Sequence, residues 1–188
     1  MNTRELIDEI KNRVANGENK AALFEQFRKK VPKESHVAFL IASTATPENI
    51  LKTRQLRTIL ITLVALLTLP LTFFAHYFVT QVEYQRGALE WLFTLAIGVA
   101  FPLLNALGML RHRFPAYTNF MTTGLVFVVL AVVALHQHAM TMTPTILVSL
   151  GLAIALIVYC GYVRSLLFPA ISWFGMVKKN SQQEYQFD

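Results

Sequence analysis

The stretch that decides the fold is residues 146–163, which read ILVSLGLAIALIVYCGYV. It carries no charged side chain, and its length is close to the roughly 20 helical residues that cross the hydrocarbon core of a bilayer. A strand of a transmembrane barrel would alternate polar and apolar residues, and this stretch does not. We therefore predict a transmembrane helix here, because a helix satisfies its own backbone hydrogen bonds in lipid.

Three further apolar runs precede this stretch, at about residues 58–79, 89–110 and 117–135. Hydrophobic residues make up 54% of the chain and charged residues only 15%, against about 25% charged in an average soluble domain. Between positions 58 and 163 the charged residues are Glu83, Arg86, Glu90, Arg111 and Arg113. So few charges exclude a soluble fold. The prediction is an all-α integral membrane protein, a four-helix transmembrane bundle with a small N-terminal cytosolic helical domain.

Prolines interrupt the first two runs, at Pro70 and Pro102. A proline lacks the backbone N–H and displaces the preceding turn, but neighbouring groups in a membrane bundle can satisfy the freed carbonyl. We expect a kink at each proline. The alternative is that each of these runs consists of two half-helices.

The orientation follows from the lysines and arginines that flank the runs. Basic residues close the N-terminal segment, fill the loop between the second and third runs, and follow the fourth run: Lys52, Arg54, Arg57, Arg111, Arg113, Arg164, Lys178 and Lys179. Sixteen basic residues lie on this side, and only Arg86 lies on the other. Because positive charge is retained in the cytoplasm, both termini are predicted to be cytoplasmic, in a bacterial inner membrane.

The predicted head domain is residues 1–57, a basic helical region that runs into the first span. A first helix is expected between a cap at Thr3 and a stop at Gly17, and a second is expected to end at Pro32. The run Thr46-Pro47-Glu48 is a strong helix start, with a capping side chain, a proline and an acid in order. We expect that last helix to continue directly into the first span.

The C-terminal region, residues 164–188, is predicted to lie outside the bundle. The segment Ser165–Val177 is apolar and aromatic, but together with the fourth run it is too long to cross the membrane simply. An interfacial segment in the headgroup region, held by Trp173, Lys178 and Lys179, fits this pattern. The last eight residues, 181–188, are expected to be disordered.

Polar side chains occur at one depth inside the predicted bundle. Asn105, Asn119 and Tyr159 each lie one or two turns from a basic flank, so they reach similar depth on three helices. Buried amides and hydroxyls usually cross-link membrane helices. A polar vestibule for a lipid headgroup or an ion is the alternative, and several copies could also line a pore with polar groups such as Asn105, Asn119 and Thr122.

The loop after the third run carries two histidines and two methionines, at His136, His138, Met140 and Met142. In an extended chain these side chains would lie on one side, and imidazoles with thioethers suit monovalent copper. A solvated or pH-sensitive loop is the simpler interpretation. These residues are therefore weak metal candidates, and no cofactor is predicted.

Basic side chains near the membrane are predicted to contact anionic lipid headgroups or a partner protein. Besides Trp173, Lys178 and Lys179, they are Arg28, Lys29, Lys30, Lys52, Arg54 and Arg57. The helix–Gly–helix around Gly17 weakly suggests a DNA-binding motif, but a basic run beside a membrane more often contacts lipid. No direct contact to nucleic acid is expected.

Several chemistries are excluded or unsupported. The single cysteine, Cys160, excludes an internal disulfide and a quinone-coupled thiol oxidase. No charged residue is predicted at the centre of a span, where proton- or ion-coupled transporters usually need one. The sequence also lacks a Gly-rich phosphate loop and a His-Glu-x-x-His pair. We therefore expect the protein not to be an enzyme.

The function that these features favour is a non-enzymatic inner-membrane subunit or scaffold, whose head recruits or responds to a cytosolic partner. A homo-oligomer is expected, because a head of this size buries little apolar surface alone. The alternative is a channel-forming or membrane-perturbing effector. A metal-binding or transport-related membrane protein is a more distant alternative.

Overall fold

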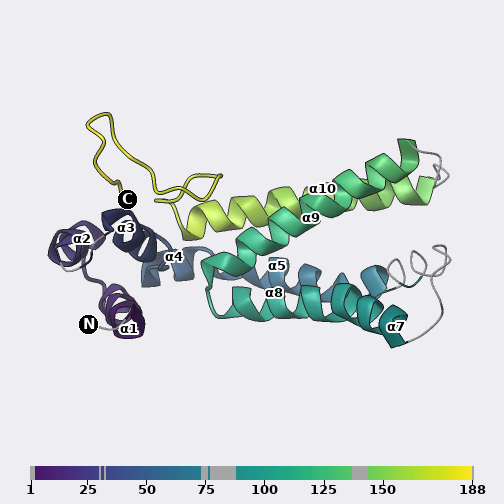
Figure 1. Ribbon diagram of the computed structural model, residues 1–188, viewed down its shortest axis with the longest axis horizontal. Coiled ribbons are helices and arrows are strands. Elements are labelled where there is room, and N and C mark those ends of the chain that lie inside the picture. Colours follow the sequence, from purple (N-terminus) through teal and green to yellow (C-terminus); the bar gives the residue numbers. More distant parts are fainter. Residues whose placement is uncertain are drawn as a thin grey trace. The chain divides into compact units, whose positions relative to one another are not determined.

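The computed structural model of the chain is all-helical (Figure 1). The residues that it describes are 3–29, 31, 33–72, 76, 88–136 and 144–187. They form two compact units. The head unit comprises Met1–Leu56, His112–Phe114 and Gly161–Asp188, and the helix unit comprises Arg57–Arg111 and Pro115–Cys160.

Four short helices begin the head unit: α1 (Thr3–Ala15), α2 (Lys20–Arg28), α3 (Glu34–Ala42) and α4 (Pro47–Lys52). Asn19 caps α2, because its side-chain oxygen accepts hydrogen bonds from the backbone N–H groups of the first turn. The α4 helix begins where its sequence signal predicts. Thr46 accepts a hydrogen bond from the N–H of Asn49, and Pro47 occupies the first turn, where its missing N–H costs nothing.

The helix that starts at Pro47 does not run unbroken into the first span, as the sequence had led us to expect. It ends at Lys52, and α5 (Arg54–Leu66) begins after a single turn residue, Thr53. The Thr53 side chain is buried, and its hydroxyl donates to the carbonyl of Asn49 at 2.6 Å. A threonine that bonds back to its own turn in this way commonly bends a helix.

The core of the head unit combines residues from both ends of the chain. Helices α1, α2 and α3 contribute apolar side chains at helical spacing, and the C-terminal region adds more. The buried hydrophobic residues include Leu6, Ile10, Val14, Leu23, Phe24, Phe27, Val37, Ile41, Val163, Leu167, Phe168, Ile171 and Phe187. The tail therefore belongs to the head's core and is not an appendage of the bundle.

The expected disordered end is ordered through residue 187. A β-bridge pairs Lys179 with Tyr185 around a turn, and the backbone N–H of Gln186 donates to the carbonyl of Lys178. Beyond that turn, the rings of Tyr185 and Phe187 lie 5.3 and 5.4 Å from the ring of Phe24 on α2. The polar run in this segment forms the turn, and the two aromatic residues after it supply the apolar surface that docks the chain.

Among the residues that the structure describes, three helices are long and apolar enough to cross a membrane: Arg54–Thr72, Phe114–Val133 and Ile146–Leu167. The last two lie within α9 (Phe114–His136) and α10 (Pro144–Leu167). The second predicted run is helical over its described length but is divided into α7 (Ala88–Leu95), the π-helix η1 (Ala96–Ala100) and α8 (Phe101–Leu110). Of this run, Ala96–Leu110 is a shorter apolar helix.

The π-helix η1 stands immediately before Pro102, where the sequence predicted a kink. The N–H of Phe101 donates to the carbonyl of Ala96, five residues earlier instead of four. This widened turn accommodates the proline ring, which would otherwise meet the carbonyl four residues before it. At Pro70 the helix is disturbed less. The first apolar helix, Arg54–Thr72, is interrupted by a turn at Leu67 and is helical again through Thr72.

Close helix packing in the helix unit depends on glycine. A Cβ added to Gly98 in η1 would lie 2.5 Å from the Cα of Thr72, in the first apolar helix. A Cβ on Gly124 of α9 would lie 3.1 Å from Ile157 of α10. Small residues allow membrane helices to approach in this way. Many leucines and valines on these helices face outward, as lipid contact requires.

Candidate functional site

The described residues hold no group of three or more His, Cys, Asp or Glu side chains that could bind a metal ion. The most developed polar arrangement is in the head unit, around Arg164. This residue lies in the last turn of α10 and is only 4% exposed. A buried guanidinium has to be satisfied by hydrogen bonds or a π-face, so its surroundings define a built site.

Arg164 holds the chain that follows α10. Its Nη2 donates to the carbonyl of Ser172 at 2.8 Å, and its Nη1 donates to the carbonyl of Trp173 at 3.2 Å. The guanidinium also lies 4.8 Å from the ring centroid of Phe114, which is cation–π distance. One side chain thus fixes two consecutive carbonyls and an aromatic ring.

Phe114 connects three parts of the head unit. Its ring makes edge contacts with Phe39 of α3 at 5.6 Å and with Phe168, just after α10, at 5.3 Å. It follows His112, whose φ of 53° lets the chain turn sharply between α8 and α9. The aromatic cluster therefore ties α3 and the end of α10 to the turn that precedes α9.

The segment that Arg164 holds is a tight turn, which we call the tip loop (residues 171–177). A β-bridge joins Ile171 to Val177, and Gly175 has a φ of 83°, a conformation that glycine adopts without strain. Side chains at the turn point outward: Trp173 is 54% exposed, Phe174 85% and Met176 66%. The predicted interfacial segment, Ser165–Val177, therefore has two parts: the end of α10, to Leu167, and, further along the chain, the tip loop.

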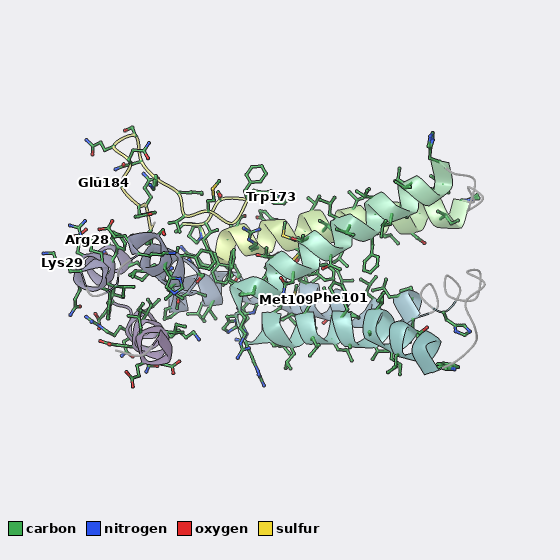
Figure 2. The ribbon with its side chains drawn as sticks, viewed as in Figure 1. Arg28, Lys29, Phe101, Met109, Trp173 and Glu184 are labelled. Carbon is green, nitrogen blue, oxygen red and sulfur yellow. The ribbon has the colours of Figure 1, made fainter. Side chains whose placement is uncertain are left out.

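The predicted basic contact residues lie at several places on the surface. Lys29, Arg54, Lys178 and Lys179 are exposed, and Arg57 is half-buried (Figure 2 labels Lys29). Lys30 lies outside the described residues.

Two of these basic residues form surface ion pairs within one helix. Arg28 pairs with Glu25 at 2.8 Å, and Lys52 pairs with Glu48 at 2.7 Å. The hydrogen bond from Lys52 lowers the pKa of the Glu48 carboxyl. Such exposed pairs add little stability, and they reduce the net positive charge that these two positions offer to a ligand.

The three predicted polar residues of the bundle have different surroundings. Asn105 is buried, and its amide donates to the carbonyl of Phe101 in its own helix at 2.7 Å. Asn119 is exposed and Tyr159 is half-buried. A polar link between helices comes instead from Tyr117, whose hydroxyl donates to the carbonyl of Met109 at 3.4 Å.

The histidine–methionine motif is described only at its first residue. His136 ends α9 and is exposed, and His138, Met140 and Met142 lie outside the described residues.

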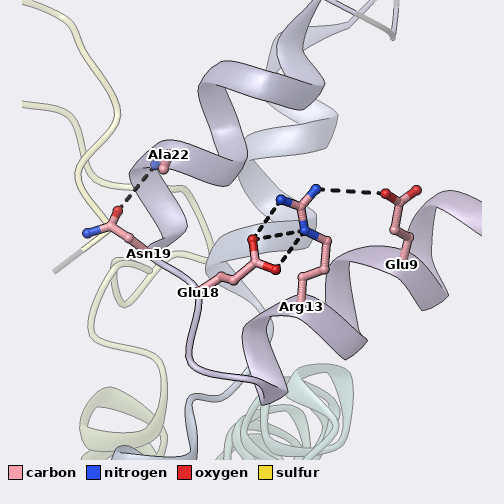
Figure 3. A network of polar contacts seen from close by, with 5 residues as sticks. All are labelled: Glu9, Arg13, Glu18, Asn19 and Ala22. Atoms are coloured by element: carbon pink, nitrogen blue, oxygen red, sulfur yellow. Dashed lines mark hydrogen bonds and ion pairs between the residues drawn. The ribbon is translucent and has the colours of Figure 1, made fainter.

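A second polar network lies at the corner between α1 and α2 (Figure 3). Arg13 donates to both carboxylate oxygens of Glu18, with a shortest distance of 2.6 Å, and its Nη1 lies 3.8 Å from Glu9. The hydrogen bond from Arg13 holds the pKa of the Glu18 carboxyl below its ordinary value. Gly17, with a φ of 82°, lets the chain turn between the two charged residues.

The sequence prediction grouped Trp173, Lys178 and Lys179 as interfacial contacts, but it did not identify the residue that holds the preceding loop. It treated Arg164 as one more basic flank, because a buried and an exposed arginine look identical in a sequence. It also overlooked Tyr185 and Phe187. Two aromatic residues in an otherwise polar tail are a docking signal that could have been used.

Comparison with known proteins finds no match: no protein-family model, no curated protein and no solved structure is similar to this chain.

Proposed function

We propose that this chain is a non-enzymatic subunit of the bacterial inner membrane. In this proposal it crosses the bilayer four times with both termini in the cytoplasm, and its head unit recruits or responds to a cytosolic partner. The subunit acts as a homo-oligomer.

Besides the three long apolar helices, the proposal needs a crossing by the second apolar run. Its support is that the region from Ala88 to Leu110 is helical throughout. At about 1.5 Å per residue this length exceeds the roughly 30 Å of a hydrocarbon core. Pro102 lacks a backbone N–H and would interrupt the hydrogen bonds of an α-helix. The π-helix before it keeps the neighbouring backbone groups hydrogen-bonded, as a helix in lipid requires.

The observation that carries the proposal is the composition of the head unit. It joins residues 1–56 to the last turn of α10 and to the tail, through Phe114, Arg164 and the Phe24–Phe187 contact. A ligand that stabilises one arrangement of this unit therefore acts on the end of a membrane-crossing helix. This is a physical route by which a bound partner would influence the bundle.

The test is a pull-down of the full-length protein in mild detergent, with mass measurement of the complex. The expected result is a complex of several copies that retains a cytosolic protein. The matched variant changes the exposed Lys29 and Lys33 to Glu, which reverses charge on the head without touching its core; partner recovery should fall while copy number stays the same. Ion flux through the purified protein alone would contradict the proposal and favour a channel.

Topology is tested by cysteine labelling in intact cells. Ser181→Cys, in the exposed tail turn, should react only with a reagent that reaches the cytoplasm, and Gln137→Cys should react from outside. The native Cys160 is buried and gives a low background. Labelling of Ser181→Cys from outside would overturn the proposed orientation.

A further inference from the structure

We propose that the tip loop is a preformed membrane-insertion loop, which places Trp173 and Phe174 in the cytoplasmic leaflet while Lys178 and Lys179 bind anionic phospholipid headgroups. The inference rests on the proposed crossing and orientation. It adds a specific ligand class, the anionic lipid surface, and a specific device that reaches it.

The first observation is the exposure of the apolar side chains at the turn. Phe174 is the most exposed of the large hydrophobic side chains in the described part of the chain, and Trp173 and Met176 flank it. Leaving this much apolar surface in water is unfavourable by about 25 cal/mol per Å². Trp is also the residue most suited to the boundary between headgroups and acyl chains, because its ring is apolar and its N–H is polar.

The second observation is that the loop is held rigidly in this shape. The N–H of Ser172 donates to the carbonyl of Met176 at 2.7 Å, and the N–H of Met176 donates to the Ser172 hydroxyl at 3.2 Å. The N–H of Gly175 returns to the carbonyl of Ser172 at 3.0 Å. These bonds satisfy three backbone N–H groups of the turn, which lowers the desolvation cost and the loss of conformational entropy on entering the interface.

The third observation is where the loop lies along α10. The helix ends at Leu167, but the carbonyls of Ser172 and Trp173 are bonded to Arg164, one turn before that end. The chain has therefore reversed direction after Leu167. The turn therefore lies beside the last turn of α10 instead of continuing away from it.

The fourth observation is the charge beside the turn. Lys178 and Lys179 follow the loop directly, and both are exposed. An exposed lysine near an anionic leaflet is attracted to it electrostatically. The apolar tip, the hydrogen-bonded turn and the adjacent cations together match an anionic lipid surface. The Lys179 ammonium also lies 4.9 Å from the ring centroid of Tyr185, outside the loop.

The experiment uses the intrinsic fluorescence of Trp173. The chain has two tryptophans, so Trp91→Phe leaves Trp173 as the sole reporter. The full-length variant is placed in lipid nanodiscs made of phosphatidylcholine, alone or mixed equally with phosphatidylglycerol. Emission is then quenched either with brominated acyl chains or with aqueous iodide. The expected result is quenching several-fold stronger by the brominated lipid than by iodide, and stronger still in the anionic nanodiscs.

Two variants give matched controls. Changing Lys178 and Lys179 to Gln should remove the extra quenching seen in anionic lipid, whereas changing the exposed Lys11 and Lys33 to Gln, with the same loss of charge, should not. Phe174→Asp should make Trp173 accessible to iodide; its side chain is solvent-exposed, so the fold is retained.

Two outcomes would overturn the inference. One is Trp173 emission that iodide quenches freely in the unaltered loop. The other is emission shielded from both quenchers, which would place the tip against protein. Either result leaves the pull-down partner and copy number unchanged, so failure of the insertion loop is distinguishable from failure of the proposed function.

Discussion

The guanidinium of Arg164 lies 4.8 Å from the ring centroid of Phe114, and the same side chain bonds the carbonyls of Ser172 and Trp173. One buried cation therefore links the start of α9, the end of α10 and the tip loop. The sequence explains Arg164 only as one of the basic residues of the positive-inside pattern. In the structure its side chain holds the C-terminal region together.

Replacing Arg164 tests this role. Arg164→Ala removes two charged hydrogen bonds and a cation–π contact, and should lower the free energy of unfolding by about 2–4 kcal/mol. Arg164→Lys keeps the charge but not the planar donor set, and should fall between alanine and the wild type. Limited proteolysis of the tail in detergent measures the effect. A wild-type cleavage rate in the alanine variant would contradict the assignment.

The docking of the tail predicts a second result. Phe187 is 6% exposed and packs on Phe24, so Phe187→Ala should destabilise the head by about 2–4 kcal/mol through the cavity that it leaves. Hydrogen exchange should then accelerate in α2. The neighbouring Gln186 is exposed, and Gln186→Ala serves as the control with no expected change. Equal exchange rates in both variants would show that the tail does not stabilise α2.

Gly98 predicts a result for the helix unit. A Cβ there would meet the backbone of Thr72 at 2.5 Å, and backbone cannot move aside as a flexible side chain can. Gly98→Ala should therefore lower stability by about 1–3 kcal/mol, measured by thermal unfolding in detergent. Gly151 in α10 has nothing within 4 Å of the equivalent position, so Gly151→Ala should be tolerated. Similar losses in the two variants would argue against close packing at Gly98.

The Arg13–Glu18 pair predicts a pH dependence. The pKa of Glu18 in the folded protein lies below its ordinary value of 4.5, so the unfolded chain binds this proton more readily. The pair's contribution is therefore complete above pH 4.5 and is lost as the pH falls through the folded pKa. Glu18→Gln should flatten this part of the acid-stability curve, followed by circular dichroism. An unchanged acid-stability curve in Glu18→Gln would contradict this contribution of the pair.

Much of the architecture could be predicted from local patterns in the chain. Membrane-spanning length is a matter of consecutive apolar residues, so three of the runs appear as helices long and apolar enough to cross. The start of α4 is equally local, because Thr46, Pro47 and Glu48 act within one turn. The second run shows the limit. Its apolar pattern is clear, but that pattern does not show that a π-helix precedes Pro102 or that Gly98 lies close to Thr72.

What the sequence by itself determined is therefore the helical class, the apolar runs and the distribution of charge, since each depends on residues close together in the chain. What only the tertiary structure decided is the use of the C-terminal region. The contacts of Arg164 with Phe114 and of Phe187 with Phe24 join residues far apart in sequence. Such contacts carry no local periodic signal. They form because a small helical head cannot bury enough apolar surface alone, and the tail supplies the surface that completes its core.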